Sequence, residues 1–244
     1  MENFEKALSR KTLKDEIFEI LHGRIIAGKY APGEWLRQED IASQLGVSQT
    51  PVREALDSLV SAGLAERVPY MGVRVIQLSP EEVADAYAMR LMLEISAARA
   101  AATLIKREQV EALREAVQKT KTLTTPNDMS QLRQLNRDIH RAIVTASGNA
   151  LLLKLYDVTV NAFPDWMLYE AMFRQPELMD ARLGAEFEEH TAIVEALSSG
   201  DPQLATVKVA AHILNQGREL EKLSGVSLEL LQAKEKQVLE SMKI

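Results

Sequence analysis

The apolar positions in the first third of the chain recur first at the spacing of helices and then in alternation, as in strands. Glycine follows directly after two of the helical patterns, at Gly46 and Gly63, where helices commonly end. Three helices and two strands are therefore expected, over residues 12–27, 38–45, 49–62, 64–69 and 73–77. This order predicts a winged helix-turn-helix whose wing is a two-stranded hairpin.

From Ser79 onward the apolar positions keep helical spacing for long stretches, and no strand pattern interrupts them. Ser79, Pro80 and Glu82 combine an N-cap serine, a proline in the first turn and a glutamate that reaches back to the cap. Helices are expected over residues 79–104, 107–122, 128–146, 150–162, 165–173, 178–198, 202–223 and 228–242. These long, one-sided helices predict an all-α antiparallel helical bundle.

Together the two patterns predict a mainly α protein with three segments. Residues 1–78 form the winged helix-turn-helix, which is a DNA-binding fold, and residues 79–222 form the helical bundle. Residues 223–244 add a tail helix, which either packs against its own bundle or serves dimerisation.

The composition narrows the chemistry that the chain can perform. Its 244 residues include no cysteine, which excludes disulfides, thiolate catalysis and iron–sulfur clusters. No apolar run is long enough for a membrane span, and the N-terminus lacks the basic-then-apolar plan of a signal peptide. A cytoplasmic location with no membrane partner is therefore expected.

The net charge of -6 argues at first sight against a DNA-binding protein, because such proteins are usually basic. Residues 1–78 carry 10 basic and 11 acidic side chains, against 29 and 35 in the whole chain. The acidity therefore belongs mostly to the bundle. The nearly neutral N-terminal segment retains a face that can bind DNA.

The expected helix 49–62 carries the strongest signal for DNA binding. Its apolar residues share one face, and the opposite face near its start displays Gln49, Thr50 and Arg53. Arginine can pair with guanine, glutamine with adenine, and threonine can reach a phosphate or a thymine methyl. The residues alone also leave a plain surface helix open, since Gln, Thr and Arg are common on any exposed helix face.

The run VSQTPVREAL, a preceding Pro-Gly pair and Gly72 in the wing occur in a recognisable order and spacing. On these residues the stretch 30–75 resembles the DNA-binding domain of the GntR family of bacterial transcription regulators. The resemblance implies a winged helix-turn-helix in which residues 49–62 form the recognition helix.

The same resemblance implies roles for single residues. Thr50 and Arg53 would contact bases and phosphates, Gly72 would approach the minor groove at the wing tip, and Arg74 would add a phosphate contact. Many members of the family have arginine where this chain has Gln49. The loss of that charge is expected to weaken attraction to phosphates and to shift base preference toward adenine.

Three of the four histidines, His140, His190 and His212, lie on three different expected helices of the bundle. Asn136 precedes His140 by four residues, so the two side chains share a helix face. Imidazoles are good ligands for transition metals, and three of them could converge inside a bundle. The alternative is three isolated, partly buried histidines, because spacing along the chain does not show convergence.

Several short pieces of the bundle resemble the FCD effector domain of the FadR branch of the GntR family. They are Tyr87–Glu94, Asn136–His140, Ser147–Asn149, Glu189–His190 and Ala211–His212. The resemblance implies a divalent transition metal, zinc, nickel or manganese, held by the three histidines and by the residue four before the first. That residue is commonly aspartate, and here it is Asn136.

A neutral Asn136 in place of a carboxylate has two expected consequences. Metal affinity should be lower, and the site should keep one more unit of positive charge, which favours an anionic effector. The resemblance also implies that Arg90 clamps the carboxylate of that effector, with Tyr87 one turn earlier as a second candidate. The alternative for Arg90 is a surface ion pair with Glu94, four residues further on.

The sequence therefore predicts a ligand-responsive bacterial transcription regulator, expected to be a repressor and not an enzyme. It would bind double-stranded DNA at a pseudo-palindromic operator as a homodimer and respond to a small carboxylate effector. Two other functions stay open at this point. One is a metal-dependent helical hydrolase or lyase, and the other is an architectural DNA-binding protein without an effector.

Overall fold

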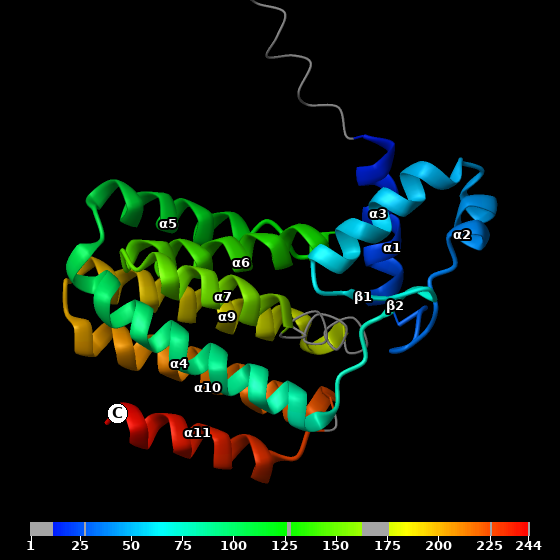
Figure 1. Cartoon of the computed structure of the whole chain (residues 1–244). Coiled ribbons are helices and arrows are strands. Elements are labelled where there is room, and N and C mark those ends of the chain that lie inside the picture. The colour runs from blue at the N-terminus through cyan, green and yellow to red at the C-terminus, as the bar shows by residue number, and fades with distance from the viewer. Residues whose placement is uncertain (1–11, 27, 126–127, 163–175, 225, 244) are drawn as a thin grey trace, which may run out of the picture. The chain divides into compact units, whose positions relative to one another are not determined.

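The computed structural model describes residues 12–26, 28–125, 128–162, 176–224 and 226–243 (Figure 1). The chain divides into two compact units, Met1–Gln77 and Leu78–Ile244. The sequence-based boundary after residue 78 lies one residue further along the chain. The expected helix 165–173 lies outside the described residues.

The N-terminal unit has the expected order of three helices and a hairpin. Its elements are α1 (Leu13–Ile26), α2 (Gln38–Leu45), α3 (Gln49–Ser61), β1 (Ala65–Val68) and β2 (Gly72–Val75). The strands pair antiparallel, with Ala65 opposite Val75 and Val68 opposite Gly72. Gly46 ends α2 in the left-handed conformation that glycine favours. The winged helix-turn-helix is confirmed, with strands slightly shorter than expected.

The core of this unit fixes which face of α3 points outward. Val52, Leu56 and Leu59 of α3 are buried, and α1 is the helix with which α3 makes its most extensive contact. Because apolar residues at this spacing occupy one face of a helix, the residues between them lie on the opposite, exposed face. That exposed face includes the start of the helix.

The second unit is an all-helical bundle within the described residues. Its helices are α4 (Pro80–Leu104), α5 (Arg107–Thr120), α6 (Met129–Ala146), α7 (Ala150–Ala162), α9 (Pro176–Ser198), α10 (Pro202–Ser224) and α11 (Leu228–Met242). The start of α4 forms the expected capping box, since Ser79 Oγ accepts from the Glu82 backbone and the Glu82 carboxylate accepts from the Ser79 backbone. Helix α4 lies between α6 and α7 on one side and α11 on the other (Figure 1).

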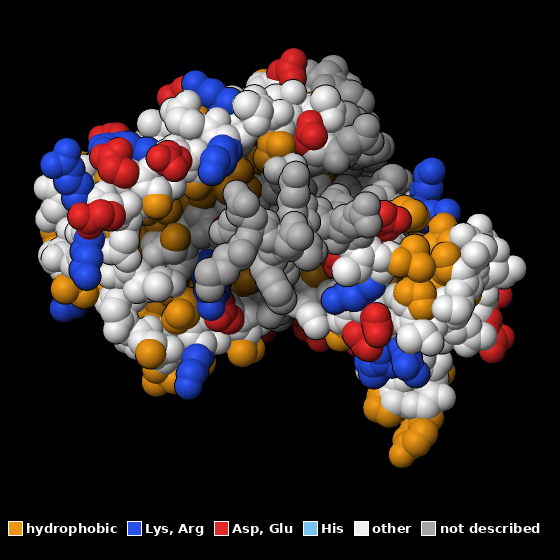
Figure 2. Space-filling view, turned by 90° about the horizontal axis from the view of Figure 1, so that it is seen from above, with side chains coloured by type: hydrophobic (Ala, Val, Ile, Leu, Met, Phe, Trp, Pro, Cys, Tyr) orange, Lys and Arg blue, Asp and Glu red, His pale blue; other side chains and the backbone are white. Residues whose placement is uncertain are grey.

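Charged side chains of both signs occur on the visible face of the bundle. Figure 2 shows Asp and Glu interspersed with Lys and Arg there, without one large patch of a single sign. Among the described helices, none is both long enough and apolar enough to cross a membrane.

The tail helix α11 packs against its own bundle. Leu231 and Val238 are buried in the main hydrophobic core, and the Tyr87 hydroxyl on α4 donates to Glu235 on α11 over 2.7 Å. Lys234 forms an ion pair with Asp85 of α4. Of the two roles left open by the sequence, packing on the same chain is therefore observed.

A glycine on α10 makes room for this contact, which leads to a test of stability. A Cβ at Gly217 would overlap the hydroxyl and ring of Tyr87, which is fully buried and held by Glu235. Gly217→Ala should therefore lower the free energy of unfolding by about 1–3 kcal/mol, as overpacking does. Gly184→Ala is the matched control, because a Cβ there meets nothing within 4 Å. In urea denaturation the control should gain about 0.5–1 kcal/mol from helix propensity, and equal effects at both positions would contradict the close contact.

Candidate functional site

The start of α3 presents the residues expected to contact DNA. Gln49, Thr50 and Arg53 are all exposed. The amide nitrogen of Gln38 donates to Oε1 of Gln49 over 3.0 Å, which holds the Gln49 side chain toward the start of α2. Arg53 forms no hydrogen bond or ion pair within the part of the chain that the structure describes. Its full charge is therefore available to a partner.

The wing differs from the expectation in one respect. Arg74 Nε donates to Glu66 over 2.8 Å, and its guanidinium lies 5.8 Å from the ring centre of Trp35. The reason is register, since Glu66 is directly opposite Arg74 in the hairpin and cross-strand neighbours of opposite charge attract. A phosphate contact from Arg74 would have to compete with this pair. Gly72 begins β2 with φ 118°, next to the fully exposed Tyr70.

Sequence reasoning did not consider Arg37. It stands at the N-cap position of α2 and is exposed, directly before the Gln38 side chain that contacts Gln49. A second cation therefore lies beside the recognition helix. The signal that could have found it is its place at the start of the helix that precedes the recognition helix in the helix-turn-helix.

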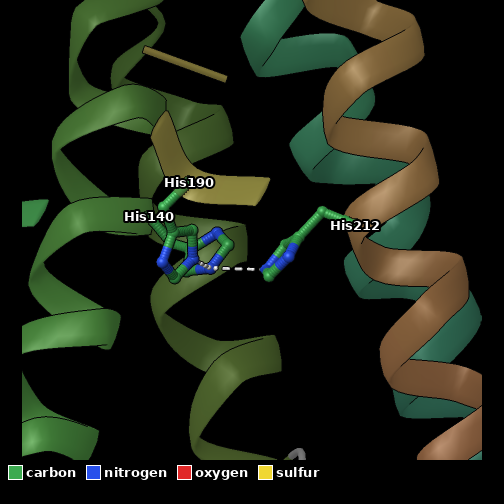
Figure 3. A group of neighbouring side chains, drawn as sticks. All are labelled: His140, His190 and His212. Atoms are coloured by element: carbon green, nitrogen blue, oxygen red, sulfur yellow. Dashed lines mark hydrogen bonds between the residues drawn. The ribbon is translucent and has the colours of Figure 1, made fainter. Parts of the chain in front are cut away.

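The second unit brings the three bundle histidines together. His140 on α6, His190 on α9 and His212 on α10 are each at most 4% exposed. Nε2 of His140 lies 3.2 Å from Nε2 of His190 and 3.2 Å from Nε2 of His212 (Figure 3). The interpretation of three isolated histidines is therefore wrong.

Two of the rings are oriented by carboxylates. Nδ1 of His140 lies 2.6 Å from Glu94, and Nδ1 of His212 lies 2.7 Å from Glu189. Because a carboxylate accepts, each Nδ1 carries the proton and each Nε2 turns a lone pair toward the centre of the cluster. The buried Nδ1 of His190 has no hydrogen-bond partner within the described residues, so no carboxylate orients this third ring.

Burial favours the neutral form of two of the rings. It lowers the pKa of His190 and of His212, and neighbouring positive charges lower them further. Lone pairs that converge on one point repel one another until a cation lies between them. The donor set therefore fits a transition metal, with carboxylates behind two of the ligands as is usual for metal-binding histidines.

Arg90 both pairs with Glu94 and lines a cavity, the two positions that the sequence left open for it. Its Nε donates to Glu94 over 2.5 Å and its Nη1 donates to Gln216 over 2.7 Å. The pair with Glu94 is buried rather than on the surface, and Arg90 lines a cavity. Although burial alone would raise the pKa of Glu94, the charge of Arg90 and the hydrogen bond from His140 hold it at about 2. Glu94 thus connects the guanidinium to the histidine cluster.

Tyr87 is not brought to this cavity, which corrects its expected role. It is fully buried, and its hydroxyl faces Glu235 of the tail helix. Positions three apart on a helix are rotated by about 60° from one another, since each residue turns the helix by about 100°. Arg90 can therefore face the cavity while Tyr87 faces α11.

The cavity has a volume of about 340 Å³ and is lined from α4, α6, α7, α9 and α10. Of the expected residues, Arg90, Asn136, His140 and His212 line it. Asn136 donates from its amide nitrogen to Glu186 over 3.1 Å. Burial and the nearby charge of Glu189 raise the pKa of Glu186 to about 7.

Sequence reasoning missed most of the polar lining. The missed residues are Arg133, Arg137, Arg182, Glu186, Asn215, Gln216, Arg218 and Glu219. Helical spacing could have found several of them, since Arg133 and Arg137 share the face of His140, and Glu186 shares that of His190.

Comparison with known proteins decides the family. Residues 13–75 match the family of bacterial regulatory proteins described as the gntR family, and residues 85–215 match the FCD domain. A probable D-xylose utilization operon transcriptional repressor of Paenarthrobacter nicotinovorans is 33% identical over 214 residues, which cover 87% of this chain and 91% of that relative. The chain belongs to the GntR family.

Other GntR-family proteins agree over most of their length. The HTH-type transcriptional repressor NanR of Enterobacter sp. (strain 638) is 26% identical over 231 residues, 85% of each chain. The solved structure of E. coli McbR/YncC has the same fold, with a TM-score of 0.65 at 21% identity, covering 87% of this chain and 99% of that one.

These relatives are transcription regulators and not enzymes. The chain is accordingly a GntR-family transcription regulator with a DNA-binding N-terminal unit and an FCD effector domain. The alternative of a metal-dependent hydrolase or lyase is set aside.

Proposed function

We propose that this regulator is a repressor whose effector is a small carboxylate bound at a transition metal in the bundle. The observation that carries the proposal is the convergence of Nε2 atoms from three helices, 3.2 Å apart, with carboxylates behind two of the rings. A metal held there would supply an open coordination position that attracts a carboxylate oxygen.

The residues around the cluster have distinct tasks in this proposal. Asn136 offers a neutral amide oxygen one turn before His140, and its amide nitrogen is held by Glu186. Arg90, held by Glu94 and Gln216, presents a guanidinium to the cavity, and its planar fork suits the two oxygens of a carboxylate.

For DNA, we propose a homodimer on a pseudo-palindromic operator, with α3 of each protomer in one major-groove half-site. Gln49, Thr50 and Arg53 would read bases and phosphates there, Gly72 would let the wing approach the minor groove, and Arg74 would contribute when its pair with Glu66 opens. The effector must bind one dimer geometry better than another, because a ligand without that preference shifts no equilibrium. If the dimer geometry that the effector favours moves the two α3 helices so that they no longer fit the two half-sites, the DNA is released.

The proposal predicts a metal-dependent response. Chelator-stripped protein should bind one zinc, nickel or manganese ion per chain in calorimetry, and His190→Ala should lower that affinity by more than the about 10–100-fold lost when a supporting residue is removed. The same variant should still bind an operator selected from random duplexes, but small carboxylates should no longer release it. His22→Gln is the control, because it changes the remaining histidine of the four, outside the cluster.

Two results would contradict this proposal. One is stripped, unaltered protein that binds none of the three metals. The other is a His190→Ala variant that stays folded and dimeric but no longer binds the operator.

A further inference from the structure

The cavity of the bundle has two chemically different ends. Helices α6, α9 and α10 each contribute one histidine of the cluster and at least one cavity-lining arginine six to eight residues away. The pairs are His140 with Arg133, His190 with Arg182, and His212 with Arg218. Arg137 adds a further guanidinium on α6.

Contacts between the helices place these arginines at one end. Asn136 contacts Glu186 and His140 contacts His190, so α6 and α9 run in the same direction. Glu189 contacts His212, so α10 runs oppositely, as the ion pair between Arg182 of α9 and Glu219 of α10 also requires.

Arg133 and Arg182 come before the histidines of α6 and α9, and Arg218 comes after the histidine of α10. Because α10 runs in the opposite direction, all three arginines lie on the same side of the histidine cluster. With a rise of about 1.5 Å per residue, the arginine backbones lie about 10 Å from the histidine level along the helix axes.

Among the described residues that line the cavity, the arginine end holds more basic than acidic side chains. Its guanidiniums are those of Arg133, Arg182 and Arg218, while Arg137, three residues before His140, lies closer to the histidine level. Glu219, at 2.6 Å from Arg182, is the acidic side chain at this level of the described cavity lining, while Glu186 lies between the two ends beside Asn136. Arg218 donates to the neutral amide oxygen of Asn215 over 2.7 Å, so this contact leaves its charge uncompensated.

Burial differs between the two ends as well. The three histidines are at most 4% exposed and Arg133 is 5% exposed, whereas Arg182 is half-buried and Arg218 is exposed. The side of the arginine end formed by α9 and α10 is therefore more accessible than the histidine cluster. A ligand with one anionic group at each end would therefore meet a guanidinium at both ends.

We infer that the effector is an extended molecule with two anionic groups, one at the histidine cluster with Arg90 and the second among the arginines at the other end. The class is a linear acid whose far end carries a carboxylate or a phosphate-like group. The inference rests on the proposed function for the histidine end. It adds the arginine end as a second anion site that determines specificity.

Matched acids test this inference in zinc-loaded full-length protein. Calorimetry would compare butyrate, valerate, hexanoate and heptanoate with the dicarboxylates of the same length, succinate, glutarate, adipate and pimelate. At the best length the dicarboxylate should bind at least about 10-fold more tightly than its partner, because it gains charge-assisted hydrogen bonds at the arginine end. Adding 6-phosphonohexanoate to the series shows whether a phosphate-like group serves better than a carboxylate.

Variants localise the second site. Arg218→Gln changes an exposed side chain, and Arg133→Gln a buried one, so the first keeps the test valid if the second fails to fold. Each should lower dicarboxylate affinity toward that of the monocarboxylate and leave monocarboxylate and zinc binding unchanged. Arg114→Gln, which removes the same charge from a surface pair with Glu195, should change none of these affinities.

The outcomes separate the inference from the proposed function. Equal binding of both series, or no effect of the arginine variants on dicarboxylates, overturns the second anion site and leaves the metal-bound carboxylate intact. Failure of every acid in both series to bind overturns both together. Dicarboxylate preference that Arg218→Gln abolishes supports the two-ended ligand.

Discussion

Replacing Arg53 by alanine should lower the affinity for a selected operator by about 100-fold or more, since a good contact to guanine contributes about 1–3 kcal/mol and a dimer makes the contact twice. Arg53 is exposed on the outward face of α3 and has no partner within the described residues. Its removal therefore disturbs no contact within the fold. Fluorescence anisotropy with a labelled duplex selected by the unaltered protein measures the loss.

The matched control removes the same charge from the same unit. Arg67 on β1 forms an ion pair with Asp57, which lies one turn further along α3 than Arg53. Arg67→Ala should change operator affinity by less than about 3-fold, the range expected for a general charge effect without a lost contact. Similar losses in both variants would show that net charge, and not the start of α3, determines binding.

Local signals predicted most of the fold because they act within a few residues. Gly46 ends α2 in the left-handed conformation, and Ser79 begins α4 with the capping box that the sequence suggested. Both depend on backbone groups of neighbouring residues, so spacing alone contains the information. The strands came out shorter than expected mainly at their outer ends, since β1 begins at Ala65 and β2 ends at Val75, and alternation of apolar residues does not fix where pairing stops.

The functional site was predictable only in part, for a physical reason. Helical spacing shows that Asn136 and His140 share a face, but it does not show which neighbouring helix that face meets. Glu94 therefore looked like the surface partner of Arg90, whereas it also lies 2.6 Å from His140, 46 positions away in sequence. Tyr87 was misplaced in the same way, because its partner Glu235 is 148 positions away.

The second large effect concerns this same glutamate. Glu94→Gln should lower the free energy of unfolding of the metal-free protein by about 3 kcal/mol, because Arg90 keeps its buried charge while its counter-charge is lost. The lowered pKa of Glu94 points in the same direction, because Arg90 and His140 favour its carboxylate form against the effect of burial. Urea denaturation at pH 7 measures the change.

The same substitution should weaken zinc binding by about 10–100-fold, since Gln retains an oxygen for His140 but loses the charge that makes the imidazole a better ligand. Glu195→Gln is the control: it removes the exposed partner of Arg114 and should cost less than about 1 kcal/mol, without a change in zinc affinity. A large loss of stability with unchanged zinc affinity would mean that Glu94 serves only to neutralise Arg90. Glu94→Gln keeps the shape of the side chain. If it lowers both the free energy of unfolding and the zinc affinity, a single carboxylate supports the Arg90 guanidinium and the histidine cluster together.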